Sequence, residues 1–178
     1  GSVLEALLLE AELIKKNQPP FNAREKDDKS FLHIVITDEA WPRVLLVRGK
    51  DLQDEKVVFG PYPNGGELKK AMVLIRKIFP YRDKCQPHSA EAPRGKPCFN
   101  AQIGLCPGVC SGTIDQQSYR KQISQLKLFL SGKQKSLYRE LEREMKILVN
   151  EQKFEEAKII RDRLFSLKHI RDVALIGR

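Results

Sequence analysis

The sequence predicts an α+β fold: a small antiparallel sheet with packed helices, a loop-rich four-cysteine metal segment, and a C-terminal antiparallel helical hairpin. Short stretches rich in Val, Ile, Leu and Phe lie in the first third of the chain. Apolar residues at helical spacing dominate the last third. All 4 cysteines fall between them, at positions 85 to 110, among many prolines and glycines.

Three stretches are predicted as strands, namely 31–37 (FLHIVIT), 43–48 (RVLLVR) and 56–59 (KVVF). Each is short, and turn-forming residues separate it from the next. Because the connections are short, we expect neighbours in sequence to pair as an antiparallel meander. The segment GPYPNGG at 60–66 is predicted as a turn.

Helices are predicted over residues 3–17, 67–79, 113–131, 134–149 and 153–173. Prolines end the first two, and Gly132 is expected to stop the third, with Thr113 or Asp115 as its N-cap. The last two helices have narrow apolar stripes and meet at Asn150, which predicts an antiparallel hairpin. Such a hairpin needs further cover, either from another hairpin or from its own domain.

The charge balance is strongly basic. The 178 residues carry 32 Lys and Arg against 23 Asp and Glu, a net charge of +9. A polyanion such as nucleic acid is therefore the expected large partner. No stretch is apolar over the roughly 18 residues that a membrane helix needs, so we expect a cytoplasmic protein without a membrane partner. No motif points to a small-molecule substrate.

The cysteines follow the spacing C-x12-C-x7-C-x3-C, at Cys85, Cys98, Cys106 and Cys110. Disulfides are disfavoured, because they need an oxidising compartment and the sequence shows no signal peptide. Zinc sites usually contain two close cysteine pairs, and only the last two cysteines are that close. Iron–sulfur ligands have more varied spacing and often a neighbouring proline, as Pro97 and Pro107 are here. Spacing alone leaves zinc, iron–sulfur and free thiols open.

Several segments, in this order, resemble one family. They are EALLLE at 5–10, LIKKNQPPFN at 13–22, DDKSF at 27–31, FGPYPNG at 59–65, LIRKIFPYR at 74–82, KPCFNAQIGLCPGVC at 96–110, YRKQISQLKLFLSGK at 119–133 and KFEEAKIIRDRL at 153–164. Each segment alone has low to moderate specificity, but their order and spacing together are very specific. The chain resembles the excinuclease UvrC family, which makes the incisions in bacterial nucleotide-excision repair.

The resemblance implies that residues 1–22 are the last helix of a truncated GIY-YIG nuclease domain. In that domain a glutamate ligates the Mg²⁺ or Mn²⁺ ion that supports phosphodiester cleavage, and Glu5 matches it. A carboxylate suits such a hard cation. The other nuclease residues would lie upstream of Glu5. We therefore expect the parent protein to be a DNA endonuclease and this fragment not to cut DNA itself.

The resemblance also implies a central α+β domain at residues 23–132, whose cysteine segment at 80–112 holds a [4Fe–4S] cluster. All 4 cysteines match the family pattern. This favours iron–sulfur, with one Zn²⁺ as the alternative. We expect the cluster to be structural, because cleavage in this family is hydrolytic.

Residues 133–178 are implied to be a hairpin with the UVR motif, through which the family binds a matching hairpin of its partner helicase, UvrB. Phe154 would be the aromatic anchor at the centre of that interface. The charged rim and the packing positions would come from Glu155, Ala157, Arg161, Asp162 and Leu164.

Basic residues between the motifs are expected to contact the backbone of duplex DNA without reading its sequence. They are Lys26, Lys29, Lys69, Lys70, Arg76, Lys77, Arg82, Lys84, Arg94 and Lys96. The alternative function is a non-enzymatic adaptor module that binds nucleic acid and contains zinc or a cluster. Glu5 distinguishes the two functions, because an adaptor needs no metal-ligating glutamate.

Overall fold

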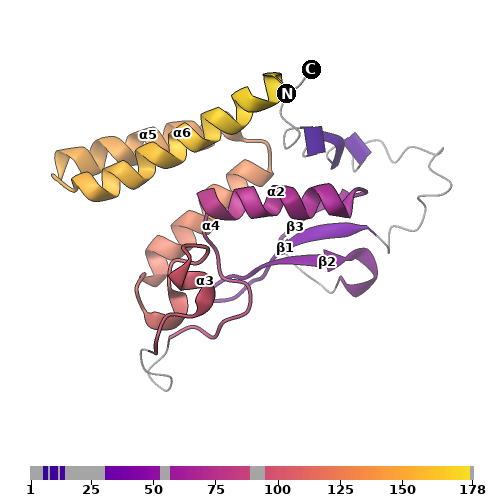
Figure 1. Cartoon of the computed structure of the whole chain (residues 1–178), viewed down its shortest axis with the longest axis horizontal. Helices are drawn as coiled ribbons and strands as arrows, with labels where there is room; N and C mark the ends of the chain where they lie inside the picture. The colour runs from indigo at the N-terminus through magenta and orange to yellow at the C-terminus, as the bar shows by residue number, and fades with distance from the viewer. Residues whose placement is uncertain are drawn as a thin grey trace. The chain divides into compact units, whose positions relative to one another are not determined.

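The computed structural model describes residues 6–7, 9–11, 13–14, 31–52, 57–88 and 95–176, with side chains as far as 169. The chain forms two compact units (Figure 1): one runs from Glu10 to Leu126, and the other contains Lys127–Arg178 together with Gly1–Leu9. The described residues between 6 and 14 are helical, as expected. The rest of the predicted helix at 3–17 lies outside the described residues. No helix in the described part of the chain is long and apolar enough to span a membrane.

The predicted three-stranded antiparallel sheet is confirmed, but the meander is wrong. The strands are β1 (Leu32–Ile36), β2 (Val44–Arg48) and β3 (Val57–Tyr62), in the order β2-β1-β3. Burial explains why β1 is central, because Ile34 and Val35 are fully buried, whereas most of β2 and β3 is only half-buried. Pro61 suits an edge strand, since it has no N–H to donate to a second neighbour.

The third strand extends beyond its predicted end at residue 59 and includes Gly60-Pro61, a pair that the sequence predicts as part of a turn. The pairing between β1 and β3 is irregular between Leu32 and Ile34. Gly60 has a φ of 122°, and a Cβ there would lie 3.2 Å from the His33 side chain. The turn-forming pair therefore makes a strand irregularity that only glycine fits.

Helix α2 (Gly65–Ile78) lies over one face of the sheet in Figure 1. Asn64 caps it, because its side-chain Oδ1 accepts a hydrogen bond of 3.1 Å from the Glu67 N–H. Its inward face is apolar and consists of Leu68, Ala71, Met72, Ile75 and Ile78. The predicted helix at 67–79 is thus confirmed, and its burial against the sheet forms the core of this unit.

Between α2 and residue 115, the described residues form only two short elements: α3 (Phe99–Gln102), which the sequence did not predict, and the 3₁₀ turn η2 (Val109–Ser111). A similar turn, η1 (Gly49–Asp51), follows β2. Regular structure resumes at α4 (Gln116–Leu130). Asp115 is its N-cap, since its Oδ1 accepts a hydrogen bond of 2.9 Å from the Ser118 N–H.

The predicted helical hairpin is confirmed. It consists of α5 (Gln134–Asn150) and α6 (Phe154–Ile176), which lie side by side in Figure 1. A tight turn joins them, in which the Lys153 N–H donates to the Leu148 carbonyl at 2.8 Å. The buried stripe between the helices contains Leu137 and Leu141 of α5 and Ala157, Ile160, Leu164 and Leu167 of α6.

Tyr119 of α4 connects three parts of the sheet-containing unit. Its hydroxyl donates to the Pro42 carbonyl at 2.6 Å and accepts from the Arg82 N–H at 3.0 Å. Its ring lies 5.6 Å from that of Trp41. Burial raises the pKa of the Tyr119 hydroxyl, so this residue remains a neutral donor at physiological pH.

The Arg82 side chain continues this network and is only 5% exposed. Its guanidinium donates to the Glu39 carboxylate at 3.0 Å and to the Trp41 carbonyl, and its Nε donates to the Cys85 carbonyl at 2.5 Å. The loop between β1 and β2 is thereby fixed to the beginning of the cysteine segment. Burial raises the pKa of Glu39, but hydrogen bonds from Arg43 and Arg82 outweigh this and lower it to about 2.

We predict that Glu39→Gln lowers the free energy of unfolding at neutral pH by about 1 to 2 kcal/mol. Because the pKa of Glu39 is lowered on folding, its contribution is present above the unfolded value near 4.5 and is lost as the pH falls toward 2. Glu39→Gln has no carboxylate to protonate, so its free energy of unfolding should fall less between pH 7 and pH 2 than that of the wild type. Denaturant melts between pH 7 and pH 2 measure it. Glu142→Gln, at an exposed position of α5, is the control and should follow the wild type. Parallel curves for all three proteins would contradict the prediction.

Candidate metal centre and binding surfaces

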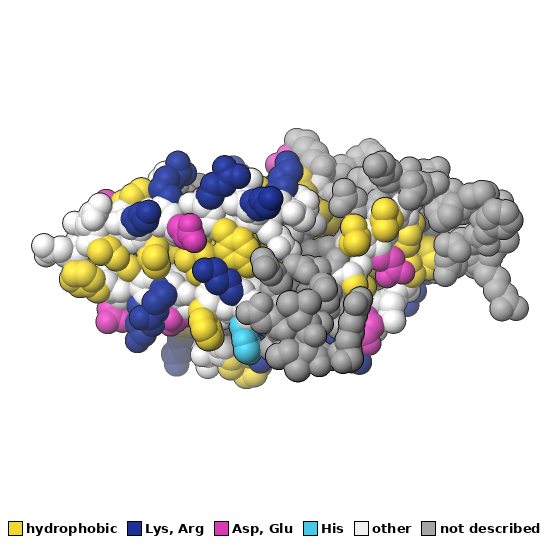
Figure 2. Space-filling view, turned by 90° about the horizontal axis from the view of Figure 1, so that it is seen from above, with side chains coloured by type: hydrophobic (Ala, Val, Ile, Leu, Met, Phe, Trp, Pro, Cys, Tyr) yellow, Lys and Arg dark blue, Asp and Glu magenta, His cyan; other side chains and the backbone are white. Residues whose placement is uncertain are grey.

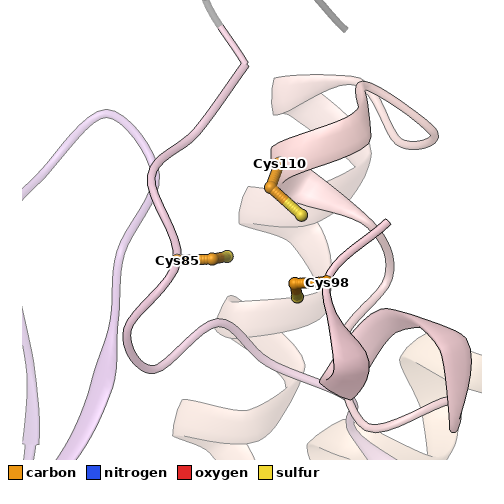
Figure 3. A group of neighbouring side chains, drawn as sticks. All are labelled: Cys85, Cys98 and Cys110. Carbon is orange, nitrogen blue, oxygen red and sulfur yellow. The ribbon is translucent and has the colours of Figure 1, made fainter. Parts of the chain in front are cut away.

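Three of the cysteines gather at one point. The Sγ atoms of Cys85, Cys98 and Cys110 all lie within 4.8 Å of one another, and the side chains are half-buried. Figure 3 shows them pointing toward a common centre from three separate segments. Cys85 follows the Arg82 network, Cys98 is the N-cap residue of α3, and Cys110 belongs to η2. Three converging thiols can hold a soft metal ion.

Backbone hydrogen bonds hold these three segments in place. The Cys98 carbonyl accepts from the Ala101 and Gln102 N–H groups at 2.9 and 3.0 Å. The His88 N–H donates to the Val109 carbonyl at 3.0 Å and so joins the first segment to the last. Gly108 has a φ of 83°, and a Cβ there would lie 2.7 Å from Thr113 Oγ1, so the turn before Cys110 requires glycine.

The thiols influence one another's ionisation. Burial and the charges of the neighbouring cysteines raise the pKa of Cys85 to about 12. Burial also opposes ionisation of Cys110, but hydrogen bonds from Cys98 and Cys85 hold the pKa of its thiol below the usual value. Repulsion from neighbouring thiolates thus opposes ionisation of Cys85, whereas hydrogen bonds favour ionisation of Cys110. A bound cation would remove that repulsion, which is the behaviour expected of a metal site.

Cys106 does not belong to this group of three sulfur atoms. It is buried, and its N–H donates to the Asn100 carbonyl at 3.1 Å. It is close enough for its charge to raise the pKa of Cys85. The structure thus brings together three of the four predicted ligands, and Cys106 as the fourth stays a prediction.

Five of the residues expected to contact DNA are exposed. Lys69, Lys70 and Lys77 lie on the outer side of α2, and Lys84 and Lys96 belong to the cysteine segment. The remaining lysines of that set, Lys26 and Lys29, lie outside the described residues, as do Arg94 and the expected nuclease glutamate, Glu5.

Arg76 and Arg82 have other partners, which argues against their expected role as phosphate ligands. The Arg76 guanidinium donates to the carbonyls of Leu105 and Tyr81 at 2.9 and 3.0 Å. It also pairs with Asp83 at 2.9 Å and lies 4.6 Å from the centre of the Tyr81 ring. The buried guanidinium of Arg82 donates its hydrogen bonds to Glu39, Trp41 and Cys85. These two charges stabilise the cysteine segment from within, a role that charge patterning in the sequence does not reveal.

The hairpin residues expected to bind a partner divide into two groups. Phe154 is 63% exposed, and Glu155, Arg161 and Asp162 are exposed with it. An ion pair of 2.8 Å joins the last two. Ala157 and Leu164, by contrast, are buried in the stripe between α5 and α6. They stabilise the hairpin itself and are not accessible to a partner.

Sequence reasoning missed two exposed apolar residues of α6, Ile159 and Phe165. Phe165 is 70% exposed, and its ring stacks on that of His169 at 6.0 Å. The available signal was that both fall outside the apolar stripe that closes the hairpin. Figure 2 shows hydrophobic side chains along the hairpin surface, interspersed with Lys and Arg. Such a mixed surface on a helical hairpin suits a protein partner.

Comparison with known proteins gives two matches along the chain. Residues 31–129 match the family described as "UvrC/Cho excinuclease, middle domain", and residues 135–170 match the "UvrB/uvrC motif". No solved structure is significantly similar.

Curated relatives match over almost the whole chain. UvrABC system protein C of Clostridium kluyveri is 42% identical over 171 residues, which are 95% of this chain and 27% of that protein. The protein of the same name from Acetivibrio thermocellus is 38% identical over 168 residues, which are 94% of this chain and 27% of that protein. The one from Rickettsia akari is 41% identical over 171 residues, which are 96% of this chain and 26% of that protein. The chain thus spans about a quarter of the length of these relatives. The family match covers more than half of the chain, and we conclude that it belongs to the UvrC family, within which it comprises the middle domain and the UvrB/UvrC motif.

Proposed function

We propose that this chain is the central part of the incision endonuclease of nucleotide-excision repair. In this role it contains a metal centre, contacts the DNA backbone and binds the UvrB helicase through its hairpin. The observation that carries the proposal is the order of the two matches, middle domain and then UvrB/UvrC motif, in a chain that also has a thiol cluster and an exposed hairpin face. The proposed domains are residues 1–22, 23–132 and 133–178. Incision itself is proposed for the whole protein, with Glu5 as a ligand of Mg²⁺ or Mn²⁺.

The alternative is a non-enzymatic adaptor that binds nucleic acid and contains zinc or a cluster. One geometric observation favours zinc: the three sulfurs lie within 4.8 Å of one another. A tetrahedral zinc ion with bonds of about 2.3 Å holds its sulfurs roughly 3.8 Å apart, so it fits this spacing. A [4Fe–4S] cluster is larger and needs its thiolates further apart. The family resemblance favours the cluster, which would give structural support to a segment with little core of its own.

We predict that the protein purified without oxygen shows a broad absorption band near ~400 nm and contains about four irons, because four thiolates would hold one cubane cluster. Cys98→Ser should lose both the band and the metal. Cys106→Ser should do the same if this buried thiol is the fourth ligand. Iron, sulfide and zinc analysis of the same samples measures the outcome. One zinc without colour would establish the alternative, and full metal retention in Cys98→Ser would contradict the site.

The hairpin is proposed to bind a matching hairpin of UvrB. Phe154 is exposed at the first turn of α6, while the buried stripe already closes the α5–α6 pair. A second hairpin placed on this face would cover Phe154 and complete a four-helix arrangement. Both signs of charge border it, with Glu155 on one side and the Arg161–Asp162 pair further along. Such a rim fixes orientation more than it adds affinity.

We predict that Phe154→Ala weakens UvrB binding at least tenfold and leaves the melting temperature unchanged, because this ring is exposed in the free chain. Leu164→Ala should lower the melting temperature, since it opens a cavity in the buried stripe. Titration calorimetry with UvrB and thermal melts measure the two effects. Val73→Ala is the control, because that side chain is 57% exposed but belongs to α2 and not to the hairpin. Equal loss of affinity in Phe154→Ala and Val73→Ala would contradict an interface on the hairpin.

The DNA contacts are proposed to come from exposed lysines alone, without Arg76 and Arg82. The lysines of α2 and of the cysteine segment are exposed, so their charges can approach phosphates; Lys70 also pairs with Glu67 at 3.2 Å. They would position a duplex without reading its sequence.

We predict that replacing Lys69, Lys70 and Lys77 together by Ala weakens duplex DNA binding and reduces the slope of log K against log salt by about 3. Fluorescence anisotropy at several salt concentrations measures both. The matched control has the same loss of charge on the hairpin, at Lys135, Lys146 and Lys158. An equal effect of both triple variants would show that only net charge matters and would contradict a contact through α2.

A further inference from the structure

An exposed aromatic side chain, that of Phe99, lies next to one cysteine of the candidate metal centre. Phe99, the residue after Cys98, is 71% exposed, and Ile103, four residues on, is exposed too. Residues four apart lie on the same side of a helical turn, so the two form one small apolar surface. The fold does not use it: the core of this unit lies between α2 and the sheet. Neither the metal ligands nor the hairpin need it.

Hydrogen bonds fix the short helix that carries Phe99. The Asn100 side chain donates a hydrogen bond of 3.1 Å to Asp83 Oδ1. The backbone carbonyl of Asn100 accepts one of 2.8 Å from the Leu105 N–H. The Gln102 side chain donates to the Pro97 carbonyl at 2.7 Å. These bonds fix α3 at both ends. The backbone that carries the ring is therefore fixed, which reduces the entropy lost when a ligand orders this segment.

The surroundings are positive and open. Residues 95–110 contain no Asp or Glu, and Lys96 lies three positions before Phe99. Lys84 adjoins Asp83, the residue that the Asn100 side chain contacts, so a second exposed lysine lies beside α3. The Asp83 carboxylate is neutralised by Arg76 at 2.9 Å. Phe99 itself is open to solvent, with 71% of the residue exposed.

We propose that Phe99 stacks on an unpaired base of single-stranded DNA, while Lys84 and Lys96 contact the neighbouring phosphates. An exposed ring beside cations is the arrangement by which proteins hold single strands, because every base has a π-face and every linkage a negative charge. Two side chains offer too little apolar area for a stable protein interface. A base in intact duplex is already stacked, so the ligand must contain an unpaired one. This inference rests on the proposed DNA binding. It specifies in addition that the DNA is single-stranded and that Phe99 contacts a base.

The test is fluorescence anisotropy with a labelled oligo-dT strand and, in parallel, a labelled duplex, using the full chain. Phe99→Ala should bind the single strand about 5- to 100-fold more weakly, with duplex affinity nearly unchanged. Phe99→Trp should retain affinity, whereas Phe99→Leu should lose it, because it keeps the apolar volume but not the ring. Phe165→Ala is the matched control: that ring is equally exposed, at 70%, but belongs to the hairpin. Lys96→Ala should lower the salt slope by about 0.7 on the single strand.

The outcomes separate this inference from the proposed function. If the wild type binds duplex and single strand, but Phe99→Ala equals the wild type or Phe99→Leu retains full affinity, the stacking contact is overturned and the lysine contacts stand. Equal losses on duplex and single strand would also overturn it, as the contact would not involve an unpaired base. If Phe99→Ala changes self-association and not DNA affinity, the surface binds protein. If the wild type binds no DNA, the proposed function fails with it.

Discussion

The buried guanidinium of Arg82 is the constraint on which the sheet-containing unit depends. It joins the loop after β1, through Glu39 and Trp41, to the carbonyl of Cys85. A charge at 5% exposure is stabilised here by three hydrogen bonds, one to a carboxylate and two to backbone carbonyls. The same network includes Tyr119, so α4 is held to the loop as well. The position of the first thiol is thus set by the folded sheet, through Arg82.

The cysteine segment obtains its order from outside and not from a core of its own. Phe99 and Ile103 are exposed, although Val109 is buried, and the regular elements among the described residues of this segment are one short helix and one 3₁₀ turn. Hydrogen bonds from Arg76 and Arg82 anchor one side. The converging thiols on the other side repel as they ionise, and a cation would convert that repulsion into a cross-link. Order in this segment therefore has two sources, a buried arginine network and a soft-ligand site.

Periodicity and capping residues are sufficient to predict the strands, α2, α4 and the hairpin, because those signals are local. Strand order is not predictable in this way: nothing near β2 or β3 shows that β1 will be the most buried strand, and the Gly60-Pro61 pair has the composition of a turn. Composition predicts the gathering of Cys85, Cys98 and Cys110, but not the separate place of Cys106. Charge type in the sequence also does not distinguish Arg76 and Arg82, which are turned inward, from Lys69 and Lys84, which are exposed. That difference depends on carbonyls brought close only by folding.

Exposed aromatic rings occur in two different electrostatic settings on this chain, and the setting indicates the partner. Phe154 lies on a long helix beside Glu155 and Glu156, and an Arg161–Asp162 pair follows. Both signs of charge border that ring, as at a protein interface with a polar rim. Phe99 lies on a short turn whose nearby exposed charges, among the residues that the structure describes, are Lys84 and Lys96. A protein surface of mixed charge would make few favourable contacts there. A DNA strand could stack a free base on the ring and place its phosphates beside the lysines. Phe154 is 63% exposed and Phe99 is 71% exposed, and the charges around them favour different classes of macromolecule, a protein for the first ring and a DNA strand for the second.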